Sequence, residues 1–287
     1  MRRHSRSLAV CWLPVPGWRR FKPMNGIHAE ISGDGVAAVF IHGSFSWGLD
    51  TFPDQRALAD AYRVVLVNRR GFPGSDMPVA EGWPVDMFDV AALLDELGSA
   101  HLVGQSYGAV VALLAAGLRP ERVLSLVAIE PPAFEVAQGD PDVDSKIAAL
   151  KPVYDGAADL TTEEFVTTWA RARGMAVERI AAWTAGFEDR DWAAAEASRN
   201  ERWPGSAPIE FGVLAAASFP KMLVRGAWKS EVIGREGAGR DLAAVCRVIA
   251  ERIGARVSVF EQSSHTPQLQ EPDAFNRLLR KLWTRTY

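Results

Sequence analysis

Short apolar segments alternate with helix-forming segments along most of the chain. The apolar segments are bounded by glycine or polar residues, which predicts strands at residues 36–41, 62–67, 101–103, 123–129, 221–225 and 256–260. Strands that alternate with helices indicate βαβ units. We therefore predict an α/β fold with a mostly parallel central sheet flanked by helices.

A polar or glycine-rich turn follows each of these predicted strands. The turns comprise residues 42–44, 68–71, 104–108, 130–132, 226–229 and 263–265. In an open parallel sheet the carboxyl ends of the strands lie at one edge, and ligands bind in the crevice there. Residues that are far apart in the sequence are therefore expected to converge at this edge.

The segment between the fourth and fifth predicted strands has helical periodicity but contains no convincing strand. It is much longer than a usual connection, so it must have structure of its own. Helices are predicted at residues 146–154, 162–172, 177–185, 192–199 and 209–217. We predict a helical cap at residues 133–217, above an α/β core formed by residues 24–132 and 218–287. Four tryptophans of this segment are expected mainly to pack the core of the cap: Trp169, Trp183, Trp192 and Trp203.

Composition indicates a globular chain without a nucleic-acid-binding footprint. Of the 287 residues, 48% are hydrophobic and 23% are charged, and the formal net charge is −3. This balance fits a small-molecule substrate, and neither nucleic acid nor a membrane is a predicted partner. Cys11 and Cys246 lie in no C-x-x-C motif or His/Cys cluster, so neither a disulfide framework nor a zinc site is predicted. We expect a cytoplasmic protein.

The first 23 residues are interpreted as a flexible N-terminal extension. Arginines precede a short apolar run at residues 8–13, a pattern that faintly imitates a signal peptide. The run is broken by Pro14 and Pro16, however, and no clear cleavage site follows it. Met24 begins a segment with the pattern of a first strand, so residues 1–23 are alternatively an extension from an upstream start.

Candidate chemistry begins at residues 104–108, which read Gly-Gln-Ser-Tyr-Gly between a predicted strand and a predicted helix. This pattern is typical of a sharp turn that holds Ser106 out of the sheet in a strained backbone conformation, because small flanking residues let strand and helix pass close to it. The following helix directs its N-terminal N–H groups toward the site, where they can stabilise a developing negative charge.

A serine hydroxyl is a poor nucleophile at neutral pH, so it needs a base and a carboxylate that orients this base. His265 follows the last predicted strand and is therefore expected at the same sheet edge as Ser106. The other histidines are less suitable: His4 lies in the extension, His28 in an edge strand, His101 at the far end of its strand, and His42 in a turn whose backbone is the more useful part.

With these motifs the chain resembles the α/β-hydrolase superfamily, of the small cap-bearing serine esterase type, over residues 24–287. The matching motifs are His42-Gly43, residues 70–75 (Arg-Gly-Phe-Pro-Gly-Ser), residues 104–108, and His265 before Glu271-Pro272. The resemblance implies that the backbone N–H groups of Ser44 and Tyr107 form the oxyanion hole, with Phe45 as an alternative donor. Two fixed donors match a tetrahedral oxyanion better than a planar carbonyl.

The acid of the triad departs from the commonest pattern of this superfamily. Many members carry an aspartate in the loop after the strand that corresponds to residues 221–225, but Lys229 stands there, and a lysine cannot accept the imidazole N–H. Glu130 ends an almost wholly apolar strand, where a carboxylate is costly to bury without a partner such as a histidine N–H. We favour Glu130 as the acid, and Glu231 is the alternative.

The resemblance implies a serine hydrolase that cleaves an ester-like bond of a small, largely apolar substrate through an acyl-enzyme on Ser106. It implies no metal, nucleotide or redox cofactor. Lactone opening, C–C bond hydrolysis and cofactor-free perhydrolysis are alternatives on the same triad. Dehalogenases and epoxide hydrolases of this fold use aspartate as the nucleophile, so Ser106 argues against both. A more distant alternative is a ligand-binding receptor of this fold without useful turnover.

Overall fold

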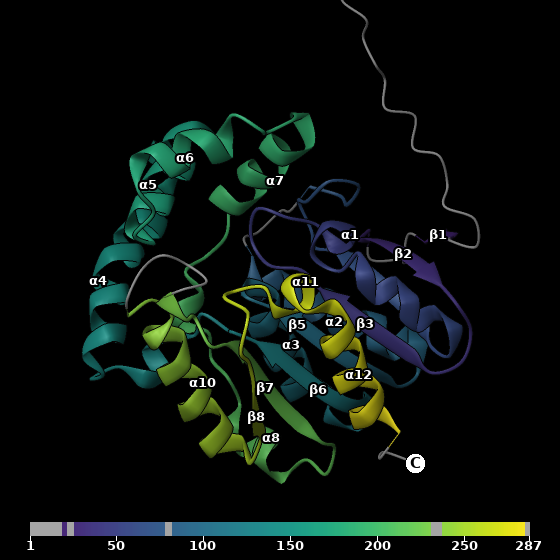
Figure 1. Ribbon diagram of the computed structural model, residues 1–287. Coiled ribbons are helices and arrows are strands. Elements are labelled where there is room, and N and C mark those ends of the chain that lie inside the picture. The colour runs from purple at the N-terminus through teal and green to yellow at the C-terminus, as the bar shows by residue number, and fades with distance from the viewer. Residues whose placement is uncertain (1–18, 22–25, 78–81, 231–236, 285–287) are drawn as a thin grey trace, which may run out of the picture.

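The computed structural model describes residues 19–21, 26–77, 82–230 and 237–284, and it contains one eight-stranded sheet (Figure 1). The strand order is β1-β2-β4-β3-β5-β6-β7-β8, and every pairing from β4 to β8 is parallel. The strands are β1 Arg19–Phe21, β2 His28–Ser32, β3 Ala37–Ile41, β4 Arg63–Asn68, β5 Ala100–Gln105, β6 Val123–Ile129, β7 Lys221–Gly226 and β8 Arg256–Phe260. The predicted mostly parallel sheet is confirmed.

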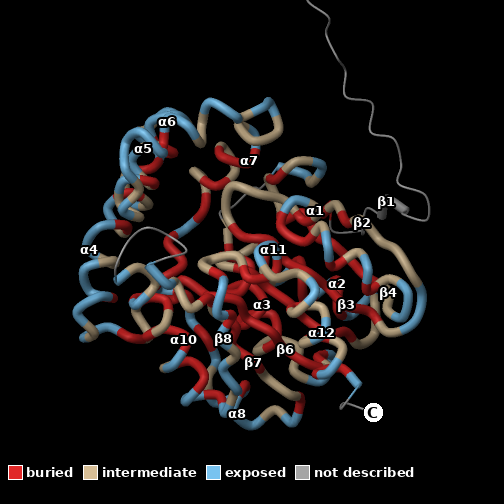
Figure 2. The backbone as a smooth tube through the Cα atoms, in the orientation of Figure 1, coloured by how far each residue is buried: buried red, intermediate tan, exposed pale blue. Residues whose placement is uncertain are grey.

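The central strands are buried on both faces, which explains why their sequences are apolar throughout. Every residue of β3 and of β5 is buried (Figure 2). Successive side chains point to opposite faces, so Val39 packs in one hydrophobic cluster and Phe40 in the other. The sheet therefore separates two cores, each of which is covered by helices.

Helices from different parts of the chain cover the two faces. The first cluster includes residues of α2 Trp83–Leu97, α3 Tyr107–Leu118 and α10 Arg240–Ile253. The second includes residues of η1 Asp54–Asp60 and α12 Pro272–Trp283. Three short helices complete this part of the chain: α1 Gly48–Thr51, η2 Pro120–Arg122 and α11 Pro267–Gln270.

The register of the parallel strands brings their carboxyl ends side by side. Ile41 of β3 is paired with Gly104 of β5, and Gln105 is paired with Ile129 of β6. Ile129 is paired in turn with Val224 of β7. The residues that follow these strands therefore share one edge of the sheet, and this edge carries the candidate site.

Helices fill the long segment between β6 and β7. In Figure 1, α4 to α7 form an arch outside the sheet, on the left and at the top of the view. The segment contains η3 Phe134–Ala137, α4 Pro141–Asp155, η4 Ala157–Asp159, α5 Thr162–Ala172, α6 Val177–Thr184, α7 Asp189–Arg199, η5 Pro204–Ser206 and α8 Phe211–Ala216. Helix α4 begins before the predicted residue 146, because Asp140 caps it with two hydrogen bonds and Pro141 starts the first turn.

The N-terminal extension needs a correction at its end. Residues 19–21, which we predicted to be part of a flexible extension, form β1 and pair with β2 in an antiparallel ladder. The first strand that we placed from Met24 is β2, and it begins only at His28. The remaining residues of the predicted extension lie outside the described ranges.

Candidate active site

Ser106 stands at the apex of a tight turn between β5 and α3. Its backbone has φ 53° and ψ −120°, and its N–H donates to the carbonyl of Ile129 over 2.8 Å. A Cβ atom on Gly104 would lie 2.2 Å from the carbonyl oxygen of Gly108, so no larger residue fits there. Strand and helix therefore pass close to each other at this turn, and Ser106 has the strained backbone conformation that the sequence pattern predicts.

Backbone strain gathers at the edge that carries this turn. Within the described residues, four residues other than glycine have positive φ: Phe45, Ser106, Glu130 and Trp228. They follow β3, β5, β6 and β7, which are neighbours in the sheet. Strained conformations of this kind persist where the surrounding structure holds them, and they cluster at active sites.

Glu130 is the acidic group that the structure places against His265. The distance from His265 Nδ1 to Glu130 Oε2 is 2.6 Å, and the Glu130 side chain is fully buried. The other oxygen, Oε1, accepts from the Gly226 N–H over 3.0 Å and from the Trp228 indole N–H over 2.7 Å. Three hydrogen bonds therefore offset the cost of burying this carboxylate.

The contact with Glu130 also sets the tautomer of His265. A carboxylate only accepts hydrogen bonds, so Nδ1 carries a proton and Nε2 of the neutral ring has a free lone pair. The His265 side chain is 27% exposed, which leaves the ring accessible. The side-chain amide of Gln105, which precedes Ser106, donates to the His265 carbonyl over 3.2 Å. This hydrogen bond joins the loop that carries His265 to the serine turn.

The loop after β7 supplies support to the carboxylate. Trp228, which the sequence analysis did not single out, donates its indole N–H to Glu130 Oε1. Its backbone has a positive φ, which directs the side chain toward this carboxylate. Lys229 forms an ion pair of 2.9 Å with Glu261, and both side chains are exposed. Glu231, the alternative acid, lies outside the described residues.

Ser106 and His265 line the same two cavities. The inner cavity, of about 20 Å³, is walled mainly by apolar side chains of the helical segment: Phe134, Leu150, Tyr154, Trp169 and Trp203. The outer cavity, of about 180 Å³, is more polar and includes Ser46, Asp50, Thr51 and Gln268. Within the described residues no hydrogen bond joins Ser106 Oγ to His265; such contacts often tighten only in the complex with substrate.

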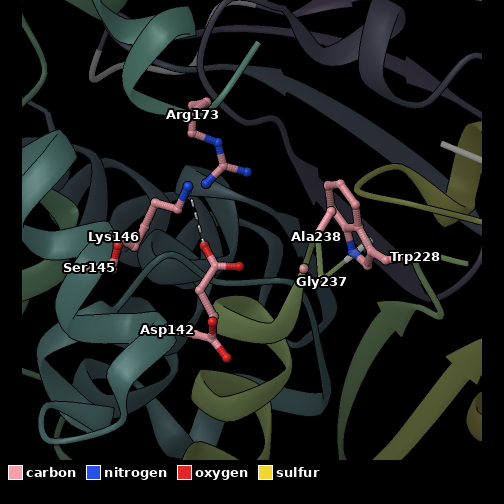
Figure 3. A pocket seen from close by; sticks show the side chains of 9 residues that line it. Asp142, Ser145, Lys146, Arg173, Trp228, Gly237 and Ala238 are labelled. Carbon is pink, nitrogen blue, oxygen red and sulfur yellow. Dashed lines mark ion pairs between the residues drawn. The ribbon is translucent and has the colours of Figure 1, made fainter. Parts of the chain in front are cut away.

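A third cavity adjoins the inner one at Arg173. It measures about 140 Å³ and is lined by Arg173, Trp228 and the ion pair of Lys146 with Asp241, among others. Figure 3 shows Arg173 reaching toward this pair, whose Nζ to Oδ2 distance is 3.9 Å, with Trp228 beside them. In the part of the chain that the structure describes, Arg173 forms no ion pair. It is therefore a cation at the boundary between two cavities.

The three candidate oxyanion donors differ in what they already bind. Phe45 donates its backbone N–H to Ser198 Oγ over 2.7 Å. Among the described residues, the backbone N–H groups of Ser44 and Tyr107 have no acceptor, and Tyr107 is the first residue of α3. The geometry therefore favours Ser44 and Tyr107 over Phe45.

His42 uses both ring nitrogens inside the protein. Nε2 accepts from the Arg69 N–H over 2.9 Å, and Nδ1 lies 2.7 Å from the Gly43 carbonyl oxygen. Burial, together with the charge of Arg69, lowers the pKa of His42 well below its ordinary value. His42 is thus a neutral structural group, and among the described histidines only His265 lines the cavities that contain Ser106.

A cluster of buried charges lies beside the site, and the sequence analysis did not predict it. Arg69 forms ion pairs with Asp86, at 2.9 Å, and with Glu201, and the three side chains are at most 3% exposed. Burial raises the pKa of Glu201 to about 7 and that of Asp86 to about 6, against the opposing effect of Arg69. The three residues come from the turn after β4, from α2 and from the helical segment, and no local sequence motif predicts their contact.

The described residues contain no group of three metal-ligating side chains, and none of their helices is long and apolar enough to cross a membrane.

Comparison with known proteins identifies relatives over most of the chain. A family model described as "Alpha/beta hydrolase family" matches residues 38–278. The chain is 28% identical to a pimeloyl-[acyl-carrier protein] methyl ester esterase of Aeromonas hydrophila, over 88% of this chain and 97% of that protein. It is 26% identical to a 2-hydroxy-6-oxo-6-phenylhexa-2,4-dienoate hydrolase of Comamonas testosteroni, over 88% and 89%.

Solved structures show the same fold. An alpha/beta hydrolase from Sphaerobacter thermophilus superposes with a TM-score of 0.68 at 22% identity, and the match covers 92% of this chain and 100% of that one.

Proposed function

This chain belongs to the alpha/beta hydrolase family, and we propose that it is a serine hydrolase that cleaves an ester-like bond through an acyl-enzyme on Ser106. The observation that carries the proposal is the 2.6 Å contact between His265 Nδ1 and the buried Glu130, at a cavity that Ser106 also lines. This contact fixes the tautomer in which Nε2 of the ring is the nitrogen that can act as a base toward Ser106.

In the proposed mechanism, Ser106 Oγ attacks the carbonyl carbon of the substrate while His265 Nε2 takes the hydroxyl proton. The carbonyl oxygen becomes an oxyanion and accepts hydrogen bonds from the N–H groups of Ser44 and Tyr107. The intermediate collapses, and the leaving alcohol takes the proton from His265. A water molecule then gives its proton to His265 and attacks the acyl-enzyme, which releases the acid and restores Ser106. Glu130 stabilises the imidazolium in both halves of the reaction.

The shape of the cavities supports a small, largely apolar acyl group. The inner cavity, at about 20 Å³, has room for only a small group, and its aromatic and aliphatic lining suits an apolar one, whereas the outer cavity, at about 180 Å³, offers polar groups to the leaving alcohol and to water. Arg173 lines both the inner cavity and the third cavity that adjoins it. An acyl chain with a polar or anionic end would place that end against Arg173.

C–C bond hydrolysis is the second candidate. A relative that is named as a 2-hydroxy-6-oxo-6-phenylhexa-2,4-dienoate hydrolase matches this chain at nearly the same identity as the esterase does. Lactone opening and perhydrolysis use the same groups. A non-catalytic receptor would have no use for a histidine held against a buried carboxylate beside a strained serine.

Labelling with a fluorophosphonate probe tests the serine chemistry directly. We expect the folded protein to be labelled on Ser106 and Ser106→Ala to remain unlabelled. A wild-type protein that stays unlabelled would overturn the proposal in favour of the receptor. Turnover of a panel of short-chain aryl esters, lactones and β-diketones then separates the enzymatic alternatives, and ester preference is the expected result.

A further inference from the structure

All three candidate oxyanion residues hydrogen-bond to one short stretch of the helical segment. The stretch is residues 198–202, at the end of α7 and just after it. Phe45 donates its N–H to Ser198 Oγ over 2.7 Å, and Ser44 Oγ donates to Glu201 Oε2 over 2.5 Å. Tyr107 donates its phenol O–H to the Arg202 carbonyl over 3.0 Å. The loop after β3 and the start of α3 are therefore both attached to this stretch.

The direction of the Ser44 N–H is fixed by its own peptide unit. This N–H and the Gly43 carbonyl belong to one trans peptide, so the orientation of one determines that of the other. The Gly43 oxygen accepts from Arg69 Nη2 over 2.9 Å and lies 2.7 Å from His42 Nδ1. Arg69 therefore helps to aim the Ser44 N–H, although it contacts neither Ser44 nor the cavity.

Glu201 supports Ser44 in two ways at once. Its Oε1 pairs with Arg69 Nη2, the same nitrogen that donates to the Gly43 carbonyl, and its Oε2 accepts from the Ser44 hydroxyl. Asp86 also pairs with Arg69, on Nη1, but Glu201 alone of these two carboxylates holds both Arg69 and Ser44 in the described contacts. Because the pair is buried, the geometry is well defined.

We propose that Glu201 is a positioning residue, which aims the Ser44 backbone N–H at the oxyanion. Turnover therefore depends on the position of residues 198–202 against the oxyanion residues. The inference rests on the proposed function. It follows that Glu201 acts on the transition state and little on substrate binding, because the N–H matters most where the negative charge develops.

The conservative variant Glu201→Gln tests this inference. The amide keeps the shape and can accept from Arg69 through its oxygen, but it carries no charge and turns a donor toward Ser44 Oγ. Loss of one oxyanion donor costs about 10²- to 10³-fold in kcat, so partial misalignment is expected to cost about tenfold. KM should stay within about twofold, and the affinity of an arylboronic acid, whose adduct with Ser106 mimics the tetrahedral intermediate, should fall with kcat.

Glu251→Gln provides the control. Glu251 belongs to α10, its side chain is exposed, and it pairs with Arg247 at 3.4 Å, with no described contact to residues 198–202 or to the oxyanion loop. We expect this variant to keep the kcat of the wild type. Ser44→Ala is a second test, since it removes the hydroxyl contacts to Glu201 and Tyr154 and leaves the backbone N–H in place. It should lower kcat about threefold to tenfold at unchanged KM, because one of the two supports remains.

The possible outcomes separate the inference from the proposed function. A Glu201→Gln protein that melts like Glu251→Gln and keeps the wild-type kcat and boronic acid affinity overturns the positioning role. A lower kcat that comes with a comparable fold-rise in KM and a lower melting temperature also overturns it, because this pattern shows a purely structural ion pair. If the wild-type protein neither hydrolyses an ester nor reacts with the fluorophosphonate probe, the proposed function fails, and the inference fails with it.

Discussion

Glu130→Gln should abolish most turnover while leaving the fold intact. In the wild-type protein Oε1 receives two N–H donors, and Oε2 receives His265 Nδ1. The glutamine oxygen fits the position of Oε1, so the amide nitrogen comes to lie where Oε2 faced His265. Two donors cannot face each other, and the ring must present Nδ1 as an acceptor and move its proton to Nε2. The base that Ser106 needs is then already protonated.

The size of this effect follows from the tautomer. Replacing the triad acid by its amide lowers kcat about 10⁴-fold in a serine hydrolase with otherwise intact geometry, which corresponds to about 5 kcal/mol in the barrier. The stability change should stay below about 2 kcal/mol, because the amide keeps the two hydrogen bonds at the Oε1 position, donates to His265 Nδ1 in the new tautomer, and removes a buried charge.

The assay is steady-state hydrolysis of an aryl ester, with thermal unfolding of the same samples. Glu231→Gln is the control for the alternative acid, and it should retain wild-type kcat within about threefold. A Glu130→Gln protein that keeps more than a tenth of the wild-type kcat would refute the reasoning, and so would equal losses in both variants.

Three further predictions concern the surroundings of this pair. Trp228→Phe removes one donor from Glu130 Oε1 but leaves the His265 contact, so it should destabilise the protein by about 1.5 to 3 kcal/mol in urea unfolding and lower kcat far less than Glu130→Gln does. Arg173→Gln should lower kcat/KM about tenfold or more for esters whose acyl chain ends in a carboxylate, and should leave neutral esters unchanged, because Arg173 is the cation at the end of the inner cavity. The pKa of Glu201, raised to about 7, predicts a pH effect on stability: the folded state holds this proton to higher pH than the unfolded state does, so stability is greatest below the unfolded pKa and is lost as pH rises toward 7. Arg69, Asp86 and Ser44 face the Glu201 carboxyl group. Glu201→Gln should therefore flatten the pH dependence of the free energy of unfolding between pH 5 and pH 8, by up to about 3 kcal/mol; an unchanged profile in the variant contradicts the prediction.

The strands and the serine turn could be predicted from sequence because their signals are local. An apolar run, a following turn and a Gly-x-Ser-x-Gly pattern each occupy a few neighbouring residues, and all six predicted strands are present. Glu130 could be singled out for a similar reason, since a glutamate at the end of an apolar strand must have a partner. The structure supplies that contact in His265, and its catalytic role stays a prediction.

The cluster around Arg69 could not be predicted in this way. Arg69 and Glu201 are separated by 132 positions in the chain, and each one taken alone looks like an ordinary surface charge. Only the packing of the helical segment against the loop after β3 brings them together. The role of Trp228 could not be predicted for a different reason, because nothing in the local sequence marks an indole N–H as the donor to a carboxylate that follows another strand.

The position of the acid has a consistent explanation in the strand order. β6 lies between β5, which carries Ser106, and β7, whose loop carries the aspartate in many members of the family. In this chain the loop after β7 gives donors instead, the Gly226 N–H and the Trp228 indole, and both point to the carboxylate at the end of β6. With Glu130 as the proposed acid, the β7 loop therefore supplies hydrogen-bond donors to the carboxylate and not the carboxylate itself. It follows that Lys229→Asp should not rescue Glu130→Gln, because the Lys229 side chain is 42% exposed and pairs with Glu261, and the glutamine amide would still donate to His265 Nδ1 and hold the wrong tautomer. Recovery of turnover in that double variant would show that the two loops act independently.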